Sequence, residues 1–264
     1  MHKHIIAAAG AAVLLALAST PAASAASLSS HGQLLRPFNA NQSTNWFGYN
    51  QGSIELGGKL FNSVSGDWTV PTATQHTSGQ SESSSDWIGI GGGCVDAGCA
   101  VGDNTLIQTG TEQDVDATGK ASYGAWWEVI PGPSINISTF SVSPGDQMHA
   151  DVTETVPNSN VWNITLTDVT KGKTFKQTVP YSSTHATAEW IEETPLLIGA
   201  NAGLASLPNL STVPFSNAKV NGASAGLVSS EEMQLIDANG KVIGSPSAPS
   251  GGTAFSACAW ATSC

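Results

Sequence analysis

The side chains able to perform chemistry in this sequence are amides and carboxylates, and they lie on short apolar stretches. The stretch NTLIQTGTEQ at residues 104–113 places Gln108 beside apolar Leu106 and Ile107. Glutamine is a poor strand former and needs hydrogen-bond partners when it is buried. On a strand, Gln108 would share one face with Leu106 and Gly110. This position therefore suggests a role beyond folding for the amide.

A second stretch, YGAWWEVIP, repeats the arrangement with a carboxylate. Because side chains alternate across a strand, Trp126 and Glu128 are expected on one face, while Trp127 and Val129 point to the other. One face thus offers a polar group, and the other offers apolar bulk for a core. A single glutamate on such a strand is usually a solvated outward residue, so this stretch alone does not define a site.

The third stretch, HATAEWIEETP, carries three glutamates. Glu189, Ile191 and Glu193 are expected on one face of a strand. Trp190 and Glu192 are expected on the opposite face. Three short strands that each offer a polar group, two of them with tryptophans, favour a functional site, but the pattern by itself stays suggestive.

The sequence does not supply the residue patterns that other kinds of catalysis require. Ser224 has the Gly-x-Ser-x-Gly spacing with Gly222 and Gly226, but no amphipathic helix follows it as that catalytic turn requires, and no pair among the six histidines has the spacing of zinc ligands. We therefore expect any hydrolysis to depend on carboxylates and amides, with no metal and no other cofactor.

The four cysteines are expected to be structural disulfides. Four cysteines allow three pairings, and closeness in the chain favours Cys94–Cys99 and Cys258–Cys264. With their thiols oxidised, these cysteines would not supply a nucleophile.

The N-terminus has the pattern of a secretory signal. Residues 1–26 contain basic Lys3, an apolar run over residues 5–18 and the small-x-small sequence Ala23-Ser24-Ala25. This predicts a signal peptide over 1–26 and a secreted, extracellular protein. Residues 27–44 are polar, and they fit either a short pro-segment or a flexible N-terminus.

Composition limits the partners. The chain has a net charge of −11, with 9 basic and 20 acidic residues. Such a chain is a poor partner for nucleic acid or an anionic membrane. It suits a soluble protein that works in acid, where carboxylates are protonated. Nothing in the sequence requires more than a monomer.

The remaining chain reads as strands. Short alternating runs are separated by Gly, Pro, Asn and Ser, and PGD, KGK and ANGK have hairpin-turn chemistry. No amphipathic helix of three turns follows the signal. The pattern predicts one all-β domain over residues 45–264, an antiparallel sandwich or barrel.

Five stretches in order resemble the glutamic peptidases (eqolisins), and the likeness covers roughly residues 44–200: NWFGY at 45–49, DWIGIGG at 86–92, LIQTGTEQ at 106–113, AWWEVIP at 125–131 and AEWIEETP at 188–195. The resemblance implies an antiparallel β-sandwich of two large curved sheets, of the concanavalin-like or jelly-roll kind. It also implies a site on the concave face of one sheet. Members of this family are secreted acid endopeptidases, which act on proteins or peptides.

The resemblance further implies roles for individual residues. Gln108 matches the catalytic glutamine, and Glu193, rather than Glu189 or the adjacent Glu192, matches the catalytic glutamate. The positions that would line or support the site are Trp46, Trp87, Glu112, Trp126, Glu128 and Glu189. In this scheme Glu193 activates a water, and the Gln108 amide orients the water and stabilises the oxyanion.

One position departs from the family. Relatives often carry Gly-Ile-Asp-Gly where this chain has Gly89-Ile90-Gly91-Gly92. A supporting carboxylate would therefore be missing at Gly91, which affects the expected rate or pH optimum rather than the reaction.

Two alternatives use the same residues differently. A carbohydrate-active enzyme on a similar sandwich would need two carboxylates about 5–9.5 Å apart, and Glu128 with Glu189 or Glu193 would supply them. A lectin-like binding module would use the tryptophans to hold a ligand without reaction. The test that separates them is loss of Gln108, which only the peptidase mechanism requires.

Overall fold

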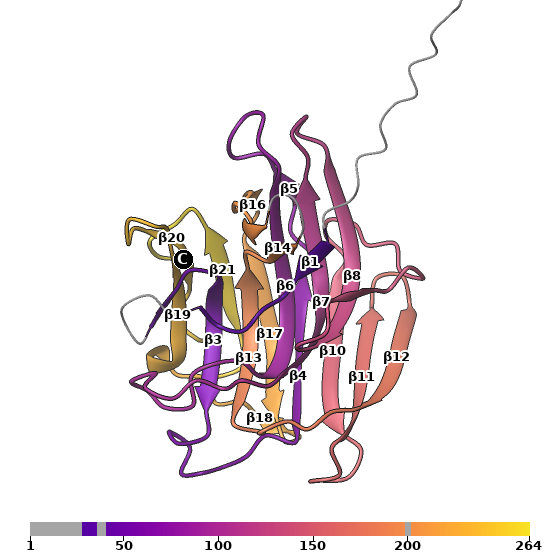
Figure 1. Cartoon of the computed structure of the whole chain (residues 1–264), viewed down its shortest axis with the longest axis vertical. Coiled ribbons are helices and arrows are strands. Elements are labelled where there is room, and N and C mark those ends of the chain that lie inside the picture. The colour runs from indigo at the N-terminus through magenta and orange to yellow at the C-terminus, as the bar shows by residue number, and fades with distance from the viewer. Residues whose placement is uncertain (1–27, 36–40, 199–201) are drawn as a thin grey trace, which may run out of the picture.

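The computed structural model describes residues 28–35, 41–198 and 202–264, and these residues form mainly antiparallel strands, most of them in two layers (Figure 1). Within them the single helical element is a 3-10 turn, η1 (Ser229–Glu231). The all-β prediction is confirmed. The predicted signal peptide lies outside the described residues. No helix in the described part of the chain is long and apolar enough to cross a membrane.

The layer that contains the five stretches resembling the glutamic peptidases is a sheet with the strand order β3-β13-β6-β7-β8-β9. Its strands are β3 (Trp46–Gly52), β13 (Thr187–Glu193), β6 (Glu82–Gly91), β7 (Leu106–Val115), β8 (Ala121–Val129) and the short edge strand β9 (Ile135–Asn136). Neighbouring strands are antiparallel throughout. We call it the site sheet.

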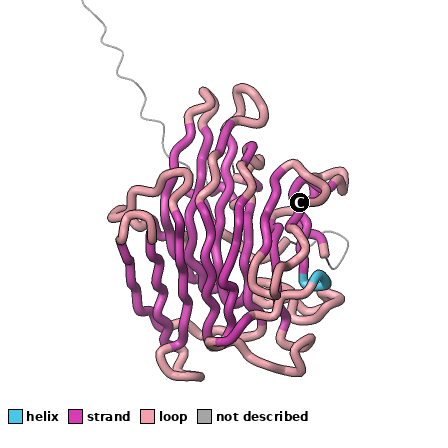
Figure 2. The backbone as a smooth tube through the Cα atoms, turned by 180° about the vertical axis from the view of Figure 1, so that it is seen from behind, coloured by secondary structure: helices cyan, strands magenta, loops and turns pink. Residues whose placement is uncertain are grey.

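The second layer follows the order β12-β11-β10-β4-β17-β21-β20-β19 and is seen from behind in Figure 2. Its strands are β12 (Lys173–Pro180), β11 (Val161–Asp168), β10 (Gln147–Glu154), β4 (Ser63–Thr69), β17 (Val213–Val220), β21 (Phe255–Ala259), β20 (Val242–Pro246) and β19 (Glu232–Ile236). Because β19 also pairs with β3, hydrogen bonding passes from one layer to the other.

Short strands decorate this sandwich. β1 (Leu28–Ser30), β14 (Leu196–Ile198) and β15 (Gly203–Leu204) form a small sheet of their own. The others are β2 (Gln42–Ser43) beside β19, β5 (Ala73–Thr74) with β16 (Asn209–Leu210), and β18 (Ala223–Ser224) beside β17. The pairing of β1 with β14 attaches the N-terminal segment close to the end of β13.

The core between the layers is built on buried tryptophans. Trp190 on β13 donates its indole N–H to the Ser65 carbonyl on β4 at 2.9 Å, and Trp68 on β4 donates to Thr111 Oγ1 on β7 at 2.8 Å. Gly66 makes the first contact possible, because a Cβ there would lie 2.8 Å from the Trp190 ring. The sequence left a sandwich or a barrel open, and the packing of the two layers selects the sandwich.

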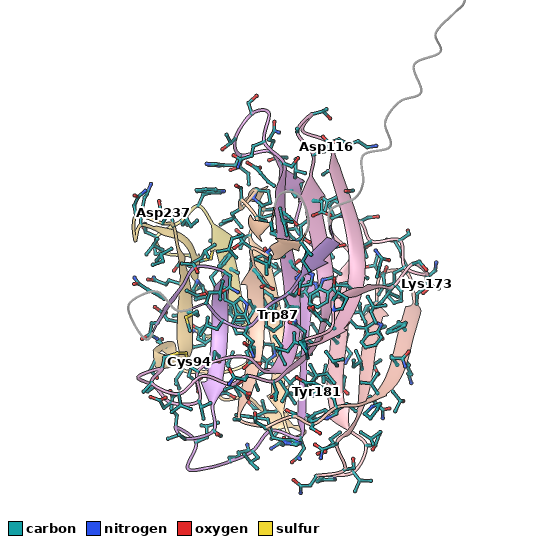
Figure 3. The ribbon with its side chains drawn as sticks, viewed as in Figure 1. Trp87, Cys94, Asp116, Lys173, Tyr181 and Asp237 are labelled. Carbon is teal, nitrogen blue, oxygen red and sulfur yellow. A yellow bond between two sulfur atoms is a disulfide. The ribbon has the colours of Figure 1, made fainter. Side chains whose placement is uncertain are left out.

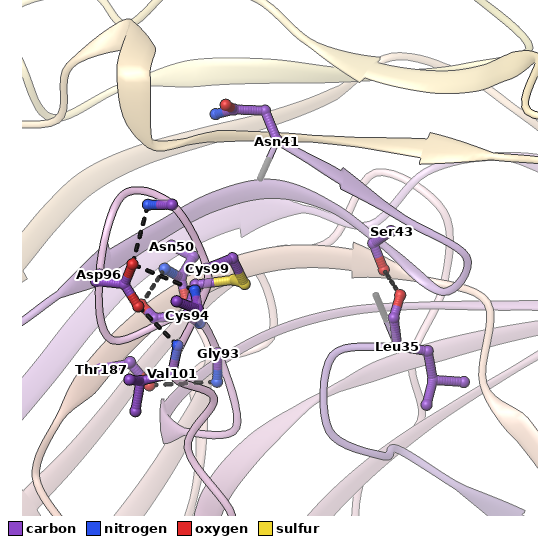
Figure 4. The surroundings of a disulfide bond; sticks show 12 residues. Leu35, Asn41, Ser43, Asn50, Gly93, Cys94, Asp96, Cys99, Val101 and Thr187 are labelled. Carbon is purple, nitrogen blue, oxygen red and sulfur yellow. Dashed lines mark hydrogen bonds between the residues drawn. A yellow bond between two sulfur atoms is a disulfide. The ribbon is translucent and has the colours of Figure 1, made fainter. Parts of the chain in front are cut away.

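Both disulfides form as closeness in the chain predicted. Cys94–Cys99 and Cys258–Cys264 leave none of the cysteines free. The first closes a loop after β6 in which Asp96 accepts backbone N–H groups, the shortest bond coming from Val101 at 2.7 Å (Figure 4). Asn50 on β3 bonds both the N–H and the carbonyl of Cys94, so this loop is fixed to the site sheet.

Candidate active site

Strand register places the predicted site residues in cross-strand rows on one face of the site sheet. Residues directly opposite in an antiparallel pair project to the same face. The rows, in the order β3-β13-β6-β7-β8, are Asn50, Glu189, Gly89, Gln108 and Glu128; then Gly48, Ile191, Trp87, Gly110 and Trp126; then Trp46, Glu193, Ser85, Glu112 and Gly124. The register bears out the shared face predicted for Trp126 with Glu128 and for Glu189 with Glu193, and it brings all eight predicted residues to one face of the sheet. Trp87 lies over the middle of the sheet (Figure 3).

Gln108 is buried and held by a carboxylate on the next strand. Glu128 lies directly opposite it, and Gln108 Nε2 donates to Glu128 Oε2 at 3.1 Å. The same nitrogen donates to the backbone carbonyl of His31 at 2.5 Å. Glu128 therefore takes one N–H of the amide and leaves the other directed at a peptide carbonyl.

Glu193 lies at the end of β13, where it is fully buried. Its Oε2 accepts the Trp87 indole N–H at 2.9 Å, and its Oε1 accepts from Asn45 Nδ2 at 3.4 Å. Burial raises the pKa of Glu193 well above its ordinary value, and the charge of Glu128 adds to the rise. The Trp87 and Asn45 donors oppose this shift, because they stabilise the ionised carboxylate.

Gln108 and Glu193 lie in different rows, two strands apart, but both contact the same residue. The His31 carbonyl accepts from Gln108, and the His31 ring Nδ1 lies 3.4 Å from Glu193 Oε2. The two side chains thus flank a space that one residue of a peptide fills.

Two further acids face this space. Burial raises the pKa of Glu128 to about 7, although bonds from Ser30, the His31 N–H and Gln108 favour its ionised form. Glu112 Oε2 lies 3.9 Å from His31 Nε2 and is largely covered. The site therefore holds several carboxyl groups around a single occupant.

Glu189 lies farther along the sheet from Glu193. It shares the row of Gln108, with Gly89 between them, and lies near the Gly93 backbone. Burial, followed by the charge of Asp103, raises its pKa well above the ordinary value. Its place is beside the disulfide loop, whereas Glu193 contacts the occupant of the site.

Glu192 points to the opposite face, as alternation predicted, and meets a partner that the sequence reasoning did not identify. It lies in the core with Asp86, whose carboxylate accepts from Gln113 Nε2 at 2.9 Å. Burial raises the pKa of Asp86 to about 6 and that of Glu192 well above its ordinary range. Alternation in DWIGIGG could have placed Asp86 on this face, since Trp87 is on the other.

The glycine that departs from the family has a local structural reason. Gly91 has φ +99°, and a Cβ there would lie 2.1 Å from the Thr105 carbonyl oxygen. This backbone conformation admits glycine and strains any other residue. A carboxylate at this position would need a different path of the chain.

His31 and Asn45 also belong to the site, and the sequence reasoning missed both. His31 was one of several scattered histidines, and it lies 77 residues from Gln108. Asn45 precedes the strand that begins with Trp46, and nothing in its spacing indicates contact with Glu193. In the described ranges no cluster of three His, Cys, Asp or Glu residues could hold a metal ion.

These features define a β-sandwich whose site sheet gathers an amide and several carboxyl groups in one buried cluster. The sequence matches the Peptidase A4 family over residues 44–257, and the chain belongs to this family of glutamic peptidases. It is therefore a peptidase, and this membership decides against the two alternatives, the carbohydrate-active enzyme and the lectin-like module.

Two individual peptidases are similar to this chain in sequence. Aspergillopepsin-2 of Aspergillus niger is 27% identical over 227 residues, covering 78% of this chain and 74% of the relative. Scytalidopepsin B of Scytalidium lignicola is 31% identical over 165 residues, covering 60% of this chain and 55% of the relative.

Solved structures show the same fold. Scytalido-glutamic peptidase with a transition state analog inhibitor has a TM-score of 0.64 at 24% identity, covering 82% of this chain and 98% of that one. Aspergilloglutamic peptidase from Aspergillus niger has a TM-score of 0.55 at 23% identity, covering 67% and 99%.

Proposed function

We propose that the protein is a secreted endopeptidase that hydrolyses proteins and peptides in acid, with Glu193 as general base and Gln108 as oxyanion donor. The observation that supports this most is the bond from Gln108 Nε2 to a peptide carbonyl, that of His31, with Glu193 on the far side of the same residue. The disulfides suit an oxidising, extracellular compartment.

The proposed reaction needs one carboxylate and one amide. Ionised Glu193 takes a proton from a water as its oxygen adds to the substrate carbonyl carbon. The Gln108 N–H that does not bond Glu128 stabilises the negative charge on the carbonyl oxygen. Glu193 then gives the proton to the leaving nitrogen, the C–N bond breaks, and a carboxylic acid and an amine separate. Glu128 keeps the amide oriented throughout.

The acid range follows from the state that Glu193 requires. When water fills the cleft, the carboxylate loses the burial that raises its pKa but keeps the donors Trp87 and Asn45. Its ionised form is then favoured relative to the covered state. Gln108 has no titratable proton, so activity needs one defined charge state.

The test is cleavage of acid-denatured casein from pH 2 to 7 by wild type, Gln108→Ala and Glu193→Gln. Loss of one oxyanion donor typically lowers the rate by about 10²–10³, and loss of the base should lower it at least as much. Gln177→Ala, on the distant strand β12, is the matched control and should cleave normally.

Chelator and serine- and cysteine-directed reagents should leave wild type active. Unchanged cleavage by Gln108→Ala or Glu193→Gln, or a covalent adduct at a serine, would contradict the mechanism.

A further inference from the structure

Two carboxyl groups that the proposed reaction does not use face each other on the core side of the site sheet. Asp86 on β6 lies directly opposite Glu192 on β13, and these strands are neighbours in the sheet (Figure 1). Both residues are fully buried. Each is followed in its strand by a residue of the candidate site, Trp87 after Asp86 and Glu193 after Glu192. We call Asp86 and Glu192 the acid pair.

The hydrogen-bond donors that reach the acid pair are few and neutral. Asp86 Oδ2 accepts from Gln113 Nε2 at 2.9 Å and from Thr111 Oγ1 at 3.4 Å. The Ser84 hydroxyl lies beside Glu192 and favours its ionised form. None of these three groups donates to Asp86 Oδ1. An ionised carboxylate only accepts hydrogen bonds, so a proton on one carboxyl group supplies a donor that the other can accept.

The side chains packed over the acid pair carry no positive charge. Among the described residues, no lysine or arginine is buried. On β3, Phe47 lies opposite Glu192. The strands of the second layer that pack against β6 and β13 are β4, β10 and β17. Their core-facing side chains are apolar: Val64, Trp68, Met148, Ala150, Val152, Phe215, Ala218 and Val220.

The ionisable groups closest to the acid pair are themselves acidic. Glu193 lies on the other face of β13, and its charge adds to the rise in the pKa of Glu192. Glu82, four residues before Asp86 on β6, accepts two backbone N–H groups at 2.6 and 2.7 Å. On β8, the Tyr123 hydroxyl accepts a backbone N–H at 3.0 Å. These surroundings offer no cation that would offset two buried carboxylates.

We propose that the acid pair shares a proton in the folded protein and acts as a pH-sensitive switch, which stabilises the closed core in acid and destabilises it toward neutral pH. The inference concerns folding and goes beyond the proposed reaction. Without the shared proton, two like charges would lie opposite each other in an apolar core. Because Trp87 and Glu193 follow the pair directly in their strands, opening of the core would also disrupt the candidate site.

The direction of the pH dependence follows from counting protons. Burial raises the pKa of Asp86 to about 6, and it raises that of Glu192 well above its ordinary value. In the unfolded chain both groups ionise near pH 4. Above about pH 4 the folded protein therefore binds more protons than the unfolded chain, and its stability falls as the pH rises. The stabilisation is complete below about pH 4 and is lost toward neutral pH.

The test is urea unfolding from pH 4 to 7 of wild type, Glu192→Gln, Asp86→Asn and the double variant. The acid pair should raise the wild-type unfolding constant by at least about a hundredfold over this range. Each single variant should lose its own part of this rise together with the part that comes from the repulsion between the two groups. The two single effects multiplied should therefore exceed the effect of the double variant by at least about tenfold.

Glu189→Gln is the matched control. Glu189 is also fully buried on β13 with a raised pKa, but it lies opposite Gly89 rather than a carboxyl group. Its effect on the pH dependence should be independent of that of Asp86→Asn. If Glu192→Gln and Asp86→Asn are independent of each other in the same way, the shared proton is refuted. An unchanged pH dependence in the double variant would refute the switch.

A second measurement uses wild type alone and covers the case in which a variant fails to fold. The side-chain carboxyl carbons of Asp86 and Glu192, followed by NMR, should change in the same steps above pH 4, because coupled groups titrate as a pair. A single separate step for each group near pH 4 would overturn the proposal. Both measurements follow folding and ionisation, so they test the acid pair whether or not the proposed peptidase mechanism is correct.

Discussion

Replacing Trp87 with phenylalanine tests whether Glu193 is the group whose ionisation limits activity in acid. The indole N–H of Trp87 donates to Glu193 Oε2 at 2.9 Å in a fully buried setting. A hydrogen bond to a charged group contributes about 1.5–3 kcal/mol. Since one pKa unit corresponds to about 1.4 kcal/mol, losing this donor should raise the pKa of Glu193 by about one to two units. The ionised fraction, and with it kcat/KM, should then fall at a given acid pH.

The assay is kcat/KM against pH for a casein-derived peptide, and the acid limb of Trp87→Phe should lie about one to two pH units higher than that of wild type. Trp190→Phe is the matched control, because Trp190 is equally buried and loses a comparable bond, to the Ser65 carbonyl. Its acid limb should not move, although its stability should fall. An unmoved limb in Trp87→Phe, or one moved to lower pH, would refute Glu193 as the base.

Two other substitutions test the sheet beneath the site. Asp86 has a folded-state pKa raised to about 6, above its ordinary 3.8, so the folded protein keeps a proton there and loses stability as pH rises through that interval. In Asp86→Asn the free energy of unfolding, measured with urea, should fall less between pH 4 and 7 than in wild type, by on the order of 2 kcal/mol. An unchanged dependence of this free energy on pH would contradict the prediction. Gly110→Ala would place a Cβ 2.2 Å from the Asp86 carbonyl oxygen, so we expect a loss of about 3 kcal/mol and a melting temperature lower by about 10 °C. Gly124→Ala, whose Cβ would meet only the movable Glu112 side chain at 3.0 Å, should melt much closer to wild type, and equal melting of the two variants would refute the clash.

Local patterns predicted the strands well and their partners poorly. The KGK and ANGK turns do join antiparallel neighbours, β11 to β12 and β19 to β20. The run SINISTFSVSPGD also alternates, but only Ile135–Asn136 is a strand, because β9 lies at the edge of the site sheet with β8 as its one neighbour. Pairing such as β19 with β3 depends on contacts far apart in the chain, which local alternation does not encode.

For the candidate site too, local patterns predicted the faces of the strands but not the contacts between distant segments. Alternation assigns Gln108, Glu128 and Glu193 each to a face of its own strand, and the cross-strand register brings those three faces together. It also separates Glu193 from Glu192, which lies in the core with Asp86. His31 was not predictable, because its place depends on the course of a polar segment whose local pattern specifies no partner.

Occupancy of the cleft and the ionisation of its base depend on the same physical quantity. A residue docked over Glu193 removes water from the carboxylate, and burial then raises its pKa, so the group holds its proton and cannot act as a base. Withdrawal of His31 would restore water, and the Trp87 and Asn45 donors would then favour the ionised form. A true substrate must leave room for one water at Glu193 Oε2, and the His31 ring, 3.4 Å from that oxygen, does not.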